Sequence, residues 1–309
     1  MWDNYTAVTE IIFEGFPEVW AVSILLFVLL LLLYIVTLLG NFFVIFLVCK
    51  DLNLHGPMYF FLANFAFVEM ALAFVITPNV LSNLLSMKKG ISFAGCFAQS
   101  YCFFLQATTD LILIATMSYD RYLAICHPLH YTTTMTGVRC VLLVLGSWFG
   151  AFLSLNTSLI LKLQLPFCGP NKINHFFCDS APLMELVCIE TKFIQILDFL
   201  LFSAVILGTL IYCIFSYTCI LLTIFRIPSA SGRQKAFSTC SSHFTIMTIV
   251  YSSSIFMYVS PRHRNSVDIN KVISAVNIFI VPVANPFIFT LRNKQVKDAM
   301  FKVIKKFNQ

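Results

Sequence analysis

Two acidic residues, Glu69 and Asp110, stand inside long runs of apolar residues. Asp110 lies eleven residues before Arg121, and Glu69 lies about as far from the start of its own run, so in helices both would be roughly 16 Å deep. Asn41 and Asn285 fall at comparable depths in other runs. Two carboxylates at one level need a shared proton, a bound cation such as sodium, or amides and water to compensate them. The pair is therefore a candidate sodium or proton site, with a protonated, structural pair as the alternative.

Four of the eleven cysteines stand where disulfide chemistry is open to them. Cys96 begins an apolar run, whereas Cys168, Cys178 and Cys188 share a polar segment that we expect outside the cell, where disulfides persist. Spacing alone permits three pairings of the four. A bridge from Cys96 to that segment would draw it over the protein as a lid. The other cysteines are expected to pack as small apolar groups: Cys49, Cys102, Cys126, Cys140, Cys213, Cys219 and Cys240.

The segment from His175 to Asp179 combines imidazole, thiolate and carboxylate groups, which are all metal ligands. A disulfide at Cys178 would remove the thiolate from that set. A loop held by hydrogen bonds of His175 and Asp179 is the favoured interpretation, and metal binding is the alternative.

The long apolar stretches that contain or flank these residues predict an all-α membrane protein. The chain has 309 residues, of which 59% are hydrophobic and 11% charged, and its 33 phenylalanines exceed what a globular surface can hide. Seven apolar stretches are about 20 or more residues long, enough for a helix to cross a bilayer. They cover residues 21–49, 57–86, 95–126, 140–161, 195–225, 236–260 and 269–291. We therefore expect one seven-helix bundle that makes 1–309 a single domain.

The ends of the runs favour an extracellular N-terminus. Lys and Arg show a modest excess on the side that this orientation makes cytoplasmic. The sequon at Asn4 lies in the short acidic N-terminal tail, where glycosylation requires a location outside the cytosol. A second sequon, at Asn156, falls inside a span and is expected to be unused. The tail has no cleavable signal pattern, and the scattered net charge of +6 does not predict a nucleic-acid partner.

The C-terminal stretch 293–306 predicts a short amphipathic eighth helix. Its lysines alternate with apolar residues that share one helical face. Such a helix lies on the anionic cytoplasmic leaflet, so membrane lipid is an expected partner. A disordered basic tail is the alternative.

Six stretches of the sequence resemble the vertebrate odorant receptors, a branch of the rhodopsin-like (class A) G-protein-coupled receptors. The most specific is 117–129, MSYDRYLAICHPL, at the end of the third span. The others are Gly40-Asn41, 54–62 (LHGPMYFFL), Ser216-Tyr217 with 235–243 (KAFSTCSSH), and 282–289 (PVANPFIF). The resemblance extends over nearly the whole chain.

The resemblance implies a multi-pass plasma-membrane receptor of olfactory sensory neuron cilia that is not an enzyme. It implies disulfides Cys96–Cys178 and Cys168–Cys188 and coupling to a stimulatory, olfactory-type heterotrimeric G protein. Arg121 would pair with Asp120 at the cytoplasmic mouth in the inactive state and release it when a G protein enters, because an unpaired buried guanidinium is costly. The implied coupling and switch residues are Asp120, Arg121, Tyr122, Tyr217, Asn285, Pro286 and Phe289.

The sequence departs from the family pattern at four positions. Glu69 stands where Asp is usual and Asp110 where Glu is common, so the acidic pair is exchanged rather than lost. Phe289 replaces the tyrosine of the Asn-Pro-x-x-Tyr motif, which removes a hydroxyl group from the expected relay. Ser252 stands where glycine is common.

A ligand pocket is expected in the outer half of the bundle. Residues thirteen to eighteen positions before Arg121 reach roughly 20–27 Å above the cytoplasmic end, and one stretch of the sixth span reaches similar heights. With the wall residues that the resemblance adds, the candidates are Phe103, Phe104, Ala107, Thr108, Ser180, Phe202, Val205, Tyr251, Ser254, Ile255, Tyr258 and Ile278. Such a pocket is apolar with a few hydroxyl groups, which predicts a small volatile odorant with one carbonyl or hydroxyl group. Asp198 leaves room for a basic odorant.

Other classes of function remain open at this point. A receptor of the same architecture for a non-odorant metabolite or lipid differs only in its ligand. A transporter would use Glu69 and Asp110 as pathway residues, but the sequence has no obvious internal repeat. An intramembrane enzyme is disfavoured because no span has a metal-ligand or nucleophile–base spacing.

Overall fold

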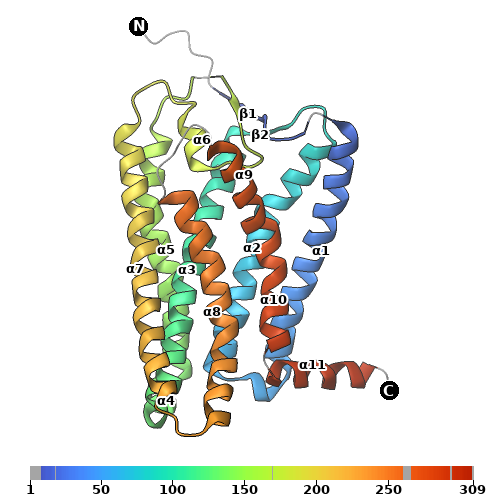
Figure 1. Ribbon diagram of the computed structural model, residues 1–309. Helices are drawn as coiled ribbons and strands as arrows, with labels where there is room; N and C mark the ends of the chain where they lie inside the picture. The colour runs from blue at the N-terminus through green and yellow to red at the C-terminus, as the bar shows by residue number, and fades with distance from the viewer. Residues whose placement is uncertain (1–7, 18, 169, 260–265, 293, 308–309) are drawn as a thin grey trace.

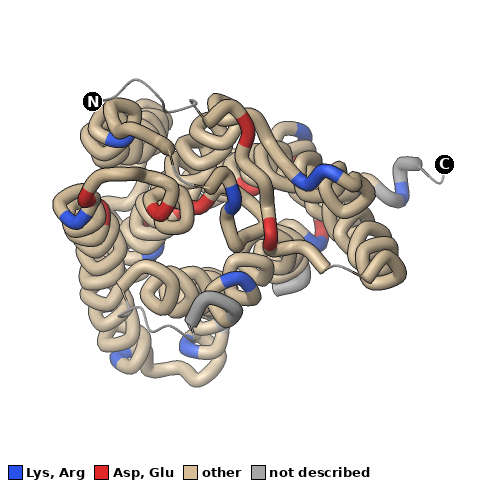
Figure 2. The backbone as a smooth tube through the Cα atoms, turned by 90° about the horizontal axis from the view of Figure 1, so that it is seen from above, with Lys and Arg blue, Asp and Glu red and all other residues tan. Residues whose placement is uncertain are grey.

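The computed structural model describes residues 8–17, 19–168, 170–259, 266–292 and 294–307. Within these ranges, the side chains at 235, 238–239, 266–268, 289–292, 294, 304 and 306–307 are outside the description. The long helices stand side by side in one bundle, with the N-terminal segment at one end and the C-terminal helix at the other (Figure 1). Seen from above, the helices surround a common centre and loops cross their ends (Figure 2).

In the part of the chain that the structure describes, seven membrane helices form the bundle. They are α1 (Trp20–Lys50), α2 (Pro57–Leu85), α3 (Phe93–Cys126), α5 (Gly137–Leu163), α7 (Lys192–Phe225), α8 (Ala230–Tyr258) and the continuous run of α9 (Ser266–Ala275), a π-helical turn (Val276–Ile280) and α10 (Val281–Arg292). Among the described residues, six of them are long and apolar enough to cross a membrane on hydropathy alone. The further helix, α8, is rich in Ser and Thr, which lowers its hydropathy.

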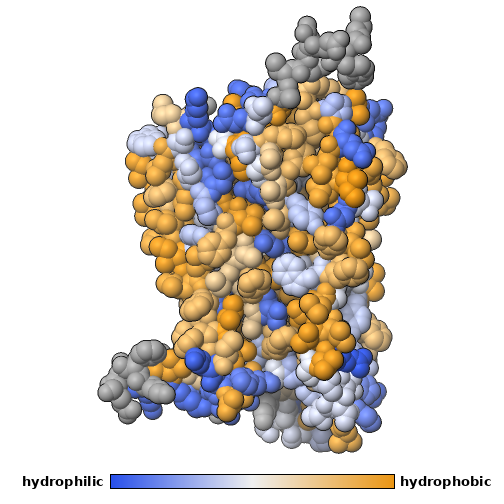
Figure 3. All heavy atoms as spheres, turned by 180° about the vertical axis from the view of Figure 1, so that it is seen from behind, coloured by the Kyte–Doolittle hydropathy of each residue, from blue (hydrophilic) through white to orange (hydrophobic). Residues whose placement is uncertain are grey.

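The outside of the bundle is apolar at mid-height. Hydrophobic side chains cover most of the middle of one face, and hydrophilic ones gather toward its two ends (Figure 3). Leu25, Leu39 and Phe215 are each more than 60% exposed, which water would penalise and lipid would not. By contrast, 72% of the residues in the most apolar 18-residue stretch of α3 are buried inside the protein. The corresponding share for α1 is 11%. The sequence prediction of a membrane bundle is confirmed, with α3 at its centre.

Side-chain caps explain where several helices begin. Ser92 accepts a hydrogen bond of 3.1 Å from the Gly95 N–H at the start of α3. Ser229 accepts one of 3.2 Å from the Gly232 N–H at the start of α8. Each serine satisfies a backbone N–H group that has no partner within its own helix.

The seventh span packs closely on α1. The Asn41 amide donates hydrogen bonds of 3.0 Å to the Pro282 carbonyl on α10 and to the Thr37 carbonyl on its own helix. Gly40 permits the approach, because a Cβ atom there would lie 3.2 Å from Cγ of Pro286. The π-helical turn that precedes α10 was not predicted from the sequence.

A small three-stranded sheet covers the extracellular end. Strand β1 (Glu10–Phe13) pairs antiparallel with β2 (Gly90–Ser92) and parallel with β3 (Lys172–Ile173). Gly15 lies against this sheet, where a Cβ atom would come within 2.5 Å of the His175 backbone. The helical prediction holds for the membrane bundle, and the sheet is an addition that the sequence analysis did not foresee.

Two short helices and a longer one lie outside the spans within the described ranges. They are α4 (Pro128–Thr134) after α3, α6 (Ser180–Met184) in the second extracellular loop, and α11 (Lys294–Phe307). The last turns aside from the other helices at the cytoplasmic end of the bundle (Figure 1). Tyr59 on α2 donates a hydrogen bond to the Gln295 side chain, and Lys302 lies 3.3 Å from Asp51. That α11 lies on the membrane surface stays a prediction.

Candidate functional site

A polar centre lies inside the bundle at mid-depth. The Asn285 amide on α10 donates a hydrogen bond of 2.5 Å to the Glu69 carboxylate on α2. Asp110 on α3 is also buried and interacts electrostatically with Glu69. One of its oxygen atoms, Oδ1, has no hydrogen-bond partner in the described part of the protein. The structure thus brings three of the four predicted polar groups together, while Asn41 binds Pro282 instead.

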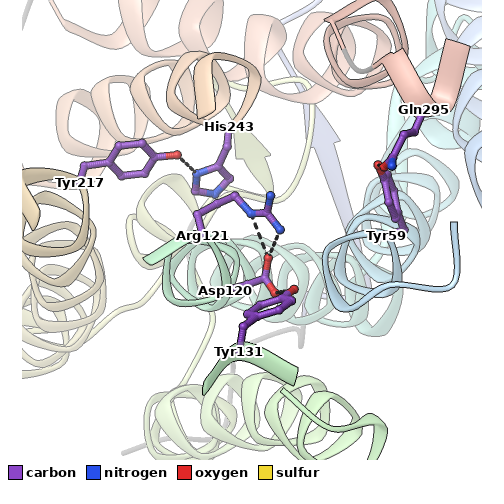
Figure 4. Close-up of polar contacts among 7 residues, drawn as sticks. All are labelled: Tyr59, Asp120, Arg121, Tyr131, Tyr217, His243 and Gln295. Carbon is purple, nitrogen blue, oxygen red and sulfur yellow. Dashed lines mark hydrogen bonds and ion pairs between the residues drawn. The ribbon is translucent and has the colours of Figure 1, made fainter. Parts of the chain in front are cut away.

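The cytoplasmic end of α3 carries a buried ion pair. Arg121 donates two hydrogen bonds to Oδ2 of Asp120, one of them from Nε at 2.9 Å. The Tyr131 hydroxyl on α4 donates a 2.7 Å hydrogen bond to the other carboxylate oxygen, Oδ1 (Figure 4). Burial raises the Tyr131 pKa well above its ordinary value, and the neighbouring Asp120 charge adds to that effect, so the phenol remains a donor. Tyr131 was not among the predicted switch residues.

A second polar contact ties three helices beside this ion pair. The Tyr217 hydroxyl on α7 lies 2.7 Å from Nδ1 of His243 on α8, and Nε2 of that ring lies 3.1 Å from the Ile114 carbonyl on α3. The Tyr217 and His243 rings stack at 5.7 Å (Figure 4). Motion of α8 away from α3 must therefore break or rearrange the His243 contacts.

The remaining predicted switch residues lie nearby or outside the description. The Tyr122 hydroxyl contacts the His127 ring at 3.0 Å on the exposed side of α3. Pro286 is buried on α10 next to Asn285. Phe289 belongs to α10, but its side chain lies outside the described residues, as does Asn4.

The outer half of the bundle contains an aromatic cavity of about 220 Å³. Phe104 on α3 stacks on Phe202 on α7 at 4.9 Å, and Tyr258 on α8 meets both rings at 5.8 Å. These three side chains and Ser180 on α6 line the cavity, so four of the predicted pocket residues meet there. Val205 lines a much smaller hollow beside it.

The other predicted pocket residues do not line this cavity. Phe103 packs against Phe177 of the loop at 4.9 Å, and Ile278 is buried in the same outer core. The Tyr251 hydroxyl donates a 3.4 Å hydrogen bond to the Leu111 carbonyl. Four more also lie off its wall: Ala107, Thr108, Ser254 and Ile255. Their part in ligand binding stays a prediction.

Sequence reasoning missed a charged cluster at the edge of this cavity. Lys162 at the end of α5 forms an ion pair of 2.6 Å with Asp198 on α7. Ser158 and Ser180 both donate hydrogen bonds to the same carboxylate. The expectation of a basic odorant at Asp198 needs correction, because a lysine already compensates that charge. Opposite charges at the outer ends of two spans were the available signal.

One disulfide ties the second extracellular loop to α3, and another lies within the loop. Cys96 at the start of α3 is bonded to Cys178, and Cys168 is bonded to Cys188 within the loop. The pairing implied by the resemblance is thus the one the structure has. The Gln99 side chain on α3 also accepts a 3.0 Å hydrogen bond from the Cys178 N–H, so the loop lies over the outer cavity.

The segment around His175 is a packed loop. His175 stacks on Phe176 at 4.8 Å, and its Nδ1 accepts a hydrogen bond from the Phe177 N–H at 3.4 Å. Burial lowers the His175 pKa below its usual value, although Asp179 opposes that shift. Cys178 is in a disulfide, and the described residues hold no group of three or more potential metal-binding side chains.

The sequence matches known proteins over almost its whole length. The family model described as "Olfactory receptor" covers residues 30–306. The chain is 49% identical to Olfactory receptor 6J1 of Homo sapiens, over 96% of this chain and 86% of that protein. It is 46% identical to Olfactory receptor 6E1 of Mus musculus, over 99% and 98%, and 44% identical to Olfactory receptor 6N1 of Homo sapiens, over 98% and 97%.

These matches agree with the bundle and its apolar exterior. A chain with this ancestry is a multi-pass protein of the plasma membrane and not an enzyme. Its aromatic cavity and its buried Arg121–Asp120 pair occupy the two ends of one helical bundle. The chain belongs to the olfactory receptor family of class A G-protein-coupled receptors.

Proposed function

We propose that this receptor binds a small, mostly apolar odorant in its outer cavity and activates a stimulatory, olfactory-type heterotrimeric G protein, which raises cAMP. The observation that carries the proposal is the aromatic cavity formed by Phe104, Phe202 and Tyr258 under the disulfide-bonded loop. By family analogy, the receptor would act in the cilia of olfactory sensory neurons.

The size and lining of the cavity support a volatile ligand. Drug-sized ligands occupy pockets of roughly 300–1,000 Å³, so a cavity of about 220 Å³ suits a smaller molecule. Burying its apolar surface against the three aromatic rings would supply most of the binding free energy. A larger hollow of about 730 Å³ lies at the cytoplasmic end between α1 and α11, where Lys50, Asp51 and Lys302 are among the lining residues.

The cytoplasmic contacts support coupling to a G protein. Asp120 holds Arg121 in a buried ion pair, and His243 holds α8 against α3. An agonist that favours an outward position of α8 would break the His243 contacts and free Arg121 for a partner helix. The free energy of those contacts sets the barrier to activity without a ligand.

We also propose that Glu69 and Asp110 hold a sodium ion or share a proton. Both carboxylates are buried, and Oδ1 of Asp110 lacks a hydrogen-bond partner in the described part of the protein. A hard cation prefers carboxylate and amide oxygens, so Glu69, Asp110 and Asn285 are the residues that would hold it. Such an ion would stabilise one packing of α2, α3 and α10 over another.

The proposal is tested with a chemically diverse odorant panel and a cAMP readout in cells that express the olfactory-type G protein. Phe104→Ala and Tyr258→Phe are expected to lower agonist potency about tenfold or more with little change in surface expression. Phe215→Ala, on the lipid-facing side of α7, is the matched control. Equal losses of potency and surface expression in Phe104→Ala and Tyr258→Phe would contradict the assignment of the outer cavity as the ligand-binding site.

A further inference from the structure

A buried ion pair joins two membrane helices at the edge of the ligand cavity. Nζ of Lys162 on α5 lies 2.6 Å from Oδ2 of Asp198 on α7. Each residue is only 9% exposed, so the pair is largely removed from water. Removing two charges from water costs free energy unless they pair with each other and accept or donate further hydrogen bonds. A site that bound only apolar molecules would not need such a pair.

Further hydrogen bonds complete the surroundings of the carboxylate. Oδ2 of Asp198 accepts a hydrogen bond of 3.0 Å from the Ser180 hydroxyl, and Oδ1 accepts one from Ser158. Lys162 also donates to the Ser180 oxygen at 2.7 Å. One carboxylate on α7 therefore connects α5, α6 and α7, and its position is fixed by donors from α5 and α6.

The two charges face different spaces. Asp198 lines the aromatic cavity of about 220 Å³, together with Phe104, Phe202 and Tyr258. Lys162 instead lines an adjoining hollow of about 30 Å³, which has room for little more than a water molecule. A ligand in the larger cavity would thus meet the carboxylate and not the ammonium group.

Another carboxylate also lies on the cavity wall. The Asp179 carboxylate accepts a 2.8 Å hydrogen bond from the Ser180 N–H and keeps further lone pairs. Gln195 lines the cavity as well, and its side-chain nitrogen donates to the Thr191 hydroxyl at 2.8 Å. Two wall residues, Asp179 and Asp198, therefore offer carboxylate oxygens to one small space.

We infer that the preferred ligands carry a hydrogen-bond donor, such as an alcohol or a phenol, and that Asp198 accepts the hydrogen bond. This inference rests on the proposed odorant function and narrows its ligand class. An aldehyde, ketone or ester presents only acceptors, which the Asp179 and Asp198 carboxylates repel, whereas the Tyr258 hydroxyl on the same wall can hydrogen-bond with either class of ligand. Lys162 is the positioning residue, because it holds the carboxylate in place and balances its charge from outside the cavity.

The test compares odorants that have the same carbon skeleton and the same number of heavy atoms. Suitable pairs are benzyl alcohol and benzaldehyde, 2-phenylethanol and phenylacetaldehyde, and cyclohexanol and cyclohexanone. A hydrogen bond to a charged group predicts that the alcohol is about tenfold to a hundredfold more potent in the cAMP assay. Equal potency, or a preference for the carbonyl compound, overturns the inference while leaving the odorant function intact.

A double variant assigns the preference to the ion pair. Lys162→Met/Asp198→Leu replaces both charges with apolar groups, which avoids leaving one buried charge unpaired. The alcohol preference is expected to fall to within about threefold. The matched control is Lys172→Gln/Glu14→Gln, which removes an exposed 2.9 Å ion pair of the loop and should keep the preference. An unchanged alcohol preference in Lys162→Met/Asp198→Leu overturns the role of Asp198.

A swapped pair keeps the test decisive if the apolar variant does not reach the cell surface. Lys162→Asp/Asp198→Lys retains an ion pair but turns an ammonium donor toward the cavity. The preference should invert, with the carbonyl compound about tenfold more potent than the alcohol. A swapped receptor that still prefers the alcohol contradicts the inference. Silence of the surface-expressed wild type toward all pairs and the wider panel would contradict the odorant function itself and this inference with it.

Discussion

The hydroxyl group of Tyr131 donates a 2.7 Å hydrogen bond to Oδ1 of Asp120, whose other oxygen binds Arg121. Tyr131 lies on α4, in the second cytoplasmic loop, and thus binds the carboxylate oxygen that Arg121 does not bind. Asp120 is fully buried, so both of its oxygens need partners. Tyr131 fixes the carboxylate in the orientation in which it holds Arg121 (Figure 4). We propose that this contact stabilises the inactive state.

Tyr131→Phe is expected to raise cAMP in the absence of ligand about threefold to fivefold. The substitution removes a hydrogen bond to a charged group, which contributes about 1 kcal/mol when it is partly screened. The measurement is basal cAMP normalised to receptor at the cell surface. Thr133→Val serves as the control, because the Thr133 hydroxyl donates only to the His130 carbonyl at 2.9 Å. Basal signalling equal to that of the wild type would contradict a locking role for Tyr131.

The two disulfides are expected to differ in importance. Cys96 and Cys178 are separated by 82 residues, whereas Cys168 and Cys188 are separated by 20. On the chain-entropy model, closing the longer loop contributes about 4–5 kcal/mol and closing the shorter one about 3 kcal/mol. The double variant Cys96→Ser/Cys178→Ser should therefore lose more surface expression than Cys168→Ser/Cys188→Ser. Flow cytometry of tagged receptors measures this order, and the reverse order would be inconsistent with the account.

Asp110→Asn is expected to abolish a stabilising effect of sodium. If Glu69 and Asp110 hold the ion, sodium at about ten times its dissociation constant should raise the Tm of the wild type by about 2–4 °C. The measurement is thermal unfolding of purified receptor in sodium chloride and in choline chloride at equal ionic strength. A wild-type receptor with the same Tm in both salts would favour the shared-proton alternative at this site.

Acid is expected to weaken the extracellular loop through His175. Burial lowers the pKa of this side chain in the folded protein below its value in the unfolded chain. The resulting stability is present above the unfolded pKa of about 6.5 and is lost as the pH falls toward the folded pKa. Between about pH 7.5 and pH 5 the Tm should fall by on the order of 2 °C.

The matched variants for this prediction are His175→Gln and His130→Gln. The first should flatten the pH dependence of the Tm, because it removes the titrating ring. The second replaces an exposed histidine on α4 and should keep the wild-type slope. Identical slopes in all three proteins would place the acid response elsewhere.

The membrane bundle was predictable because its signal is local. Twenty apolar residues in a row have few alternatives to a membrane helix, and motifs such as 117–129 identify the family. The pairing of Cys96 with Cys178 followed from the family resemblance, since spacing alone left three choices. These expectations needed no knowledge of which helices are neighbours.

The details that escaped prediction depend on contacts between distant segments. Lys162 lies near the end of α5 and Asp198 near the start of α7. Only the packing of α5 beside α7 brings these two charges together as an ion pair. Tyr131 acquires its role because α4 folds back to Asp120. Strand β1 is four residues long and is stabilised by partners about 80 and 160 residues away along the chain, which no local pattern reveals.

The most direct test of the receptor account is agonist-dependent nucleotide exchange on purified G protein. Receptor in nanodiscs is mixed with stimulatory, olfactory-type heterotrimer and an odorant found active in the cell assay, and binding of a non-hydrolysable GTP analogue is followed. The account predicts at least about tenfold faster exchange with odorant, reduced to the receptor-free rate by Arg121→Ala and to near the ligand-free rate by Phe104→Ala. Exchange that the odorant does not accelerate, or that Arg121→Ala leaves unchanged, would contradict it.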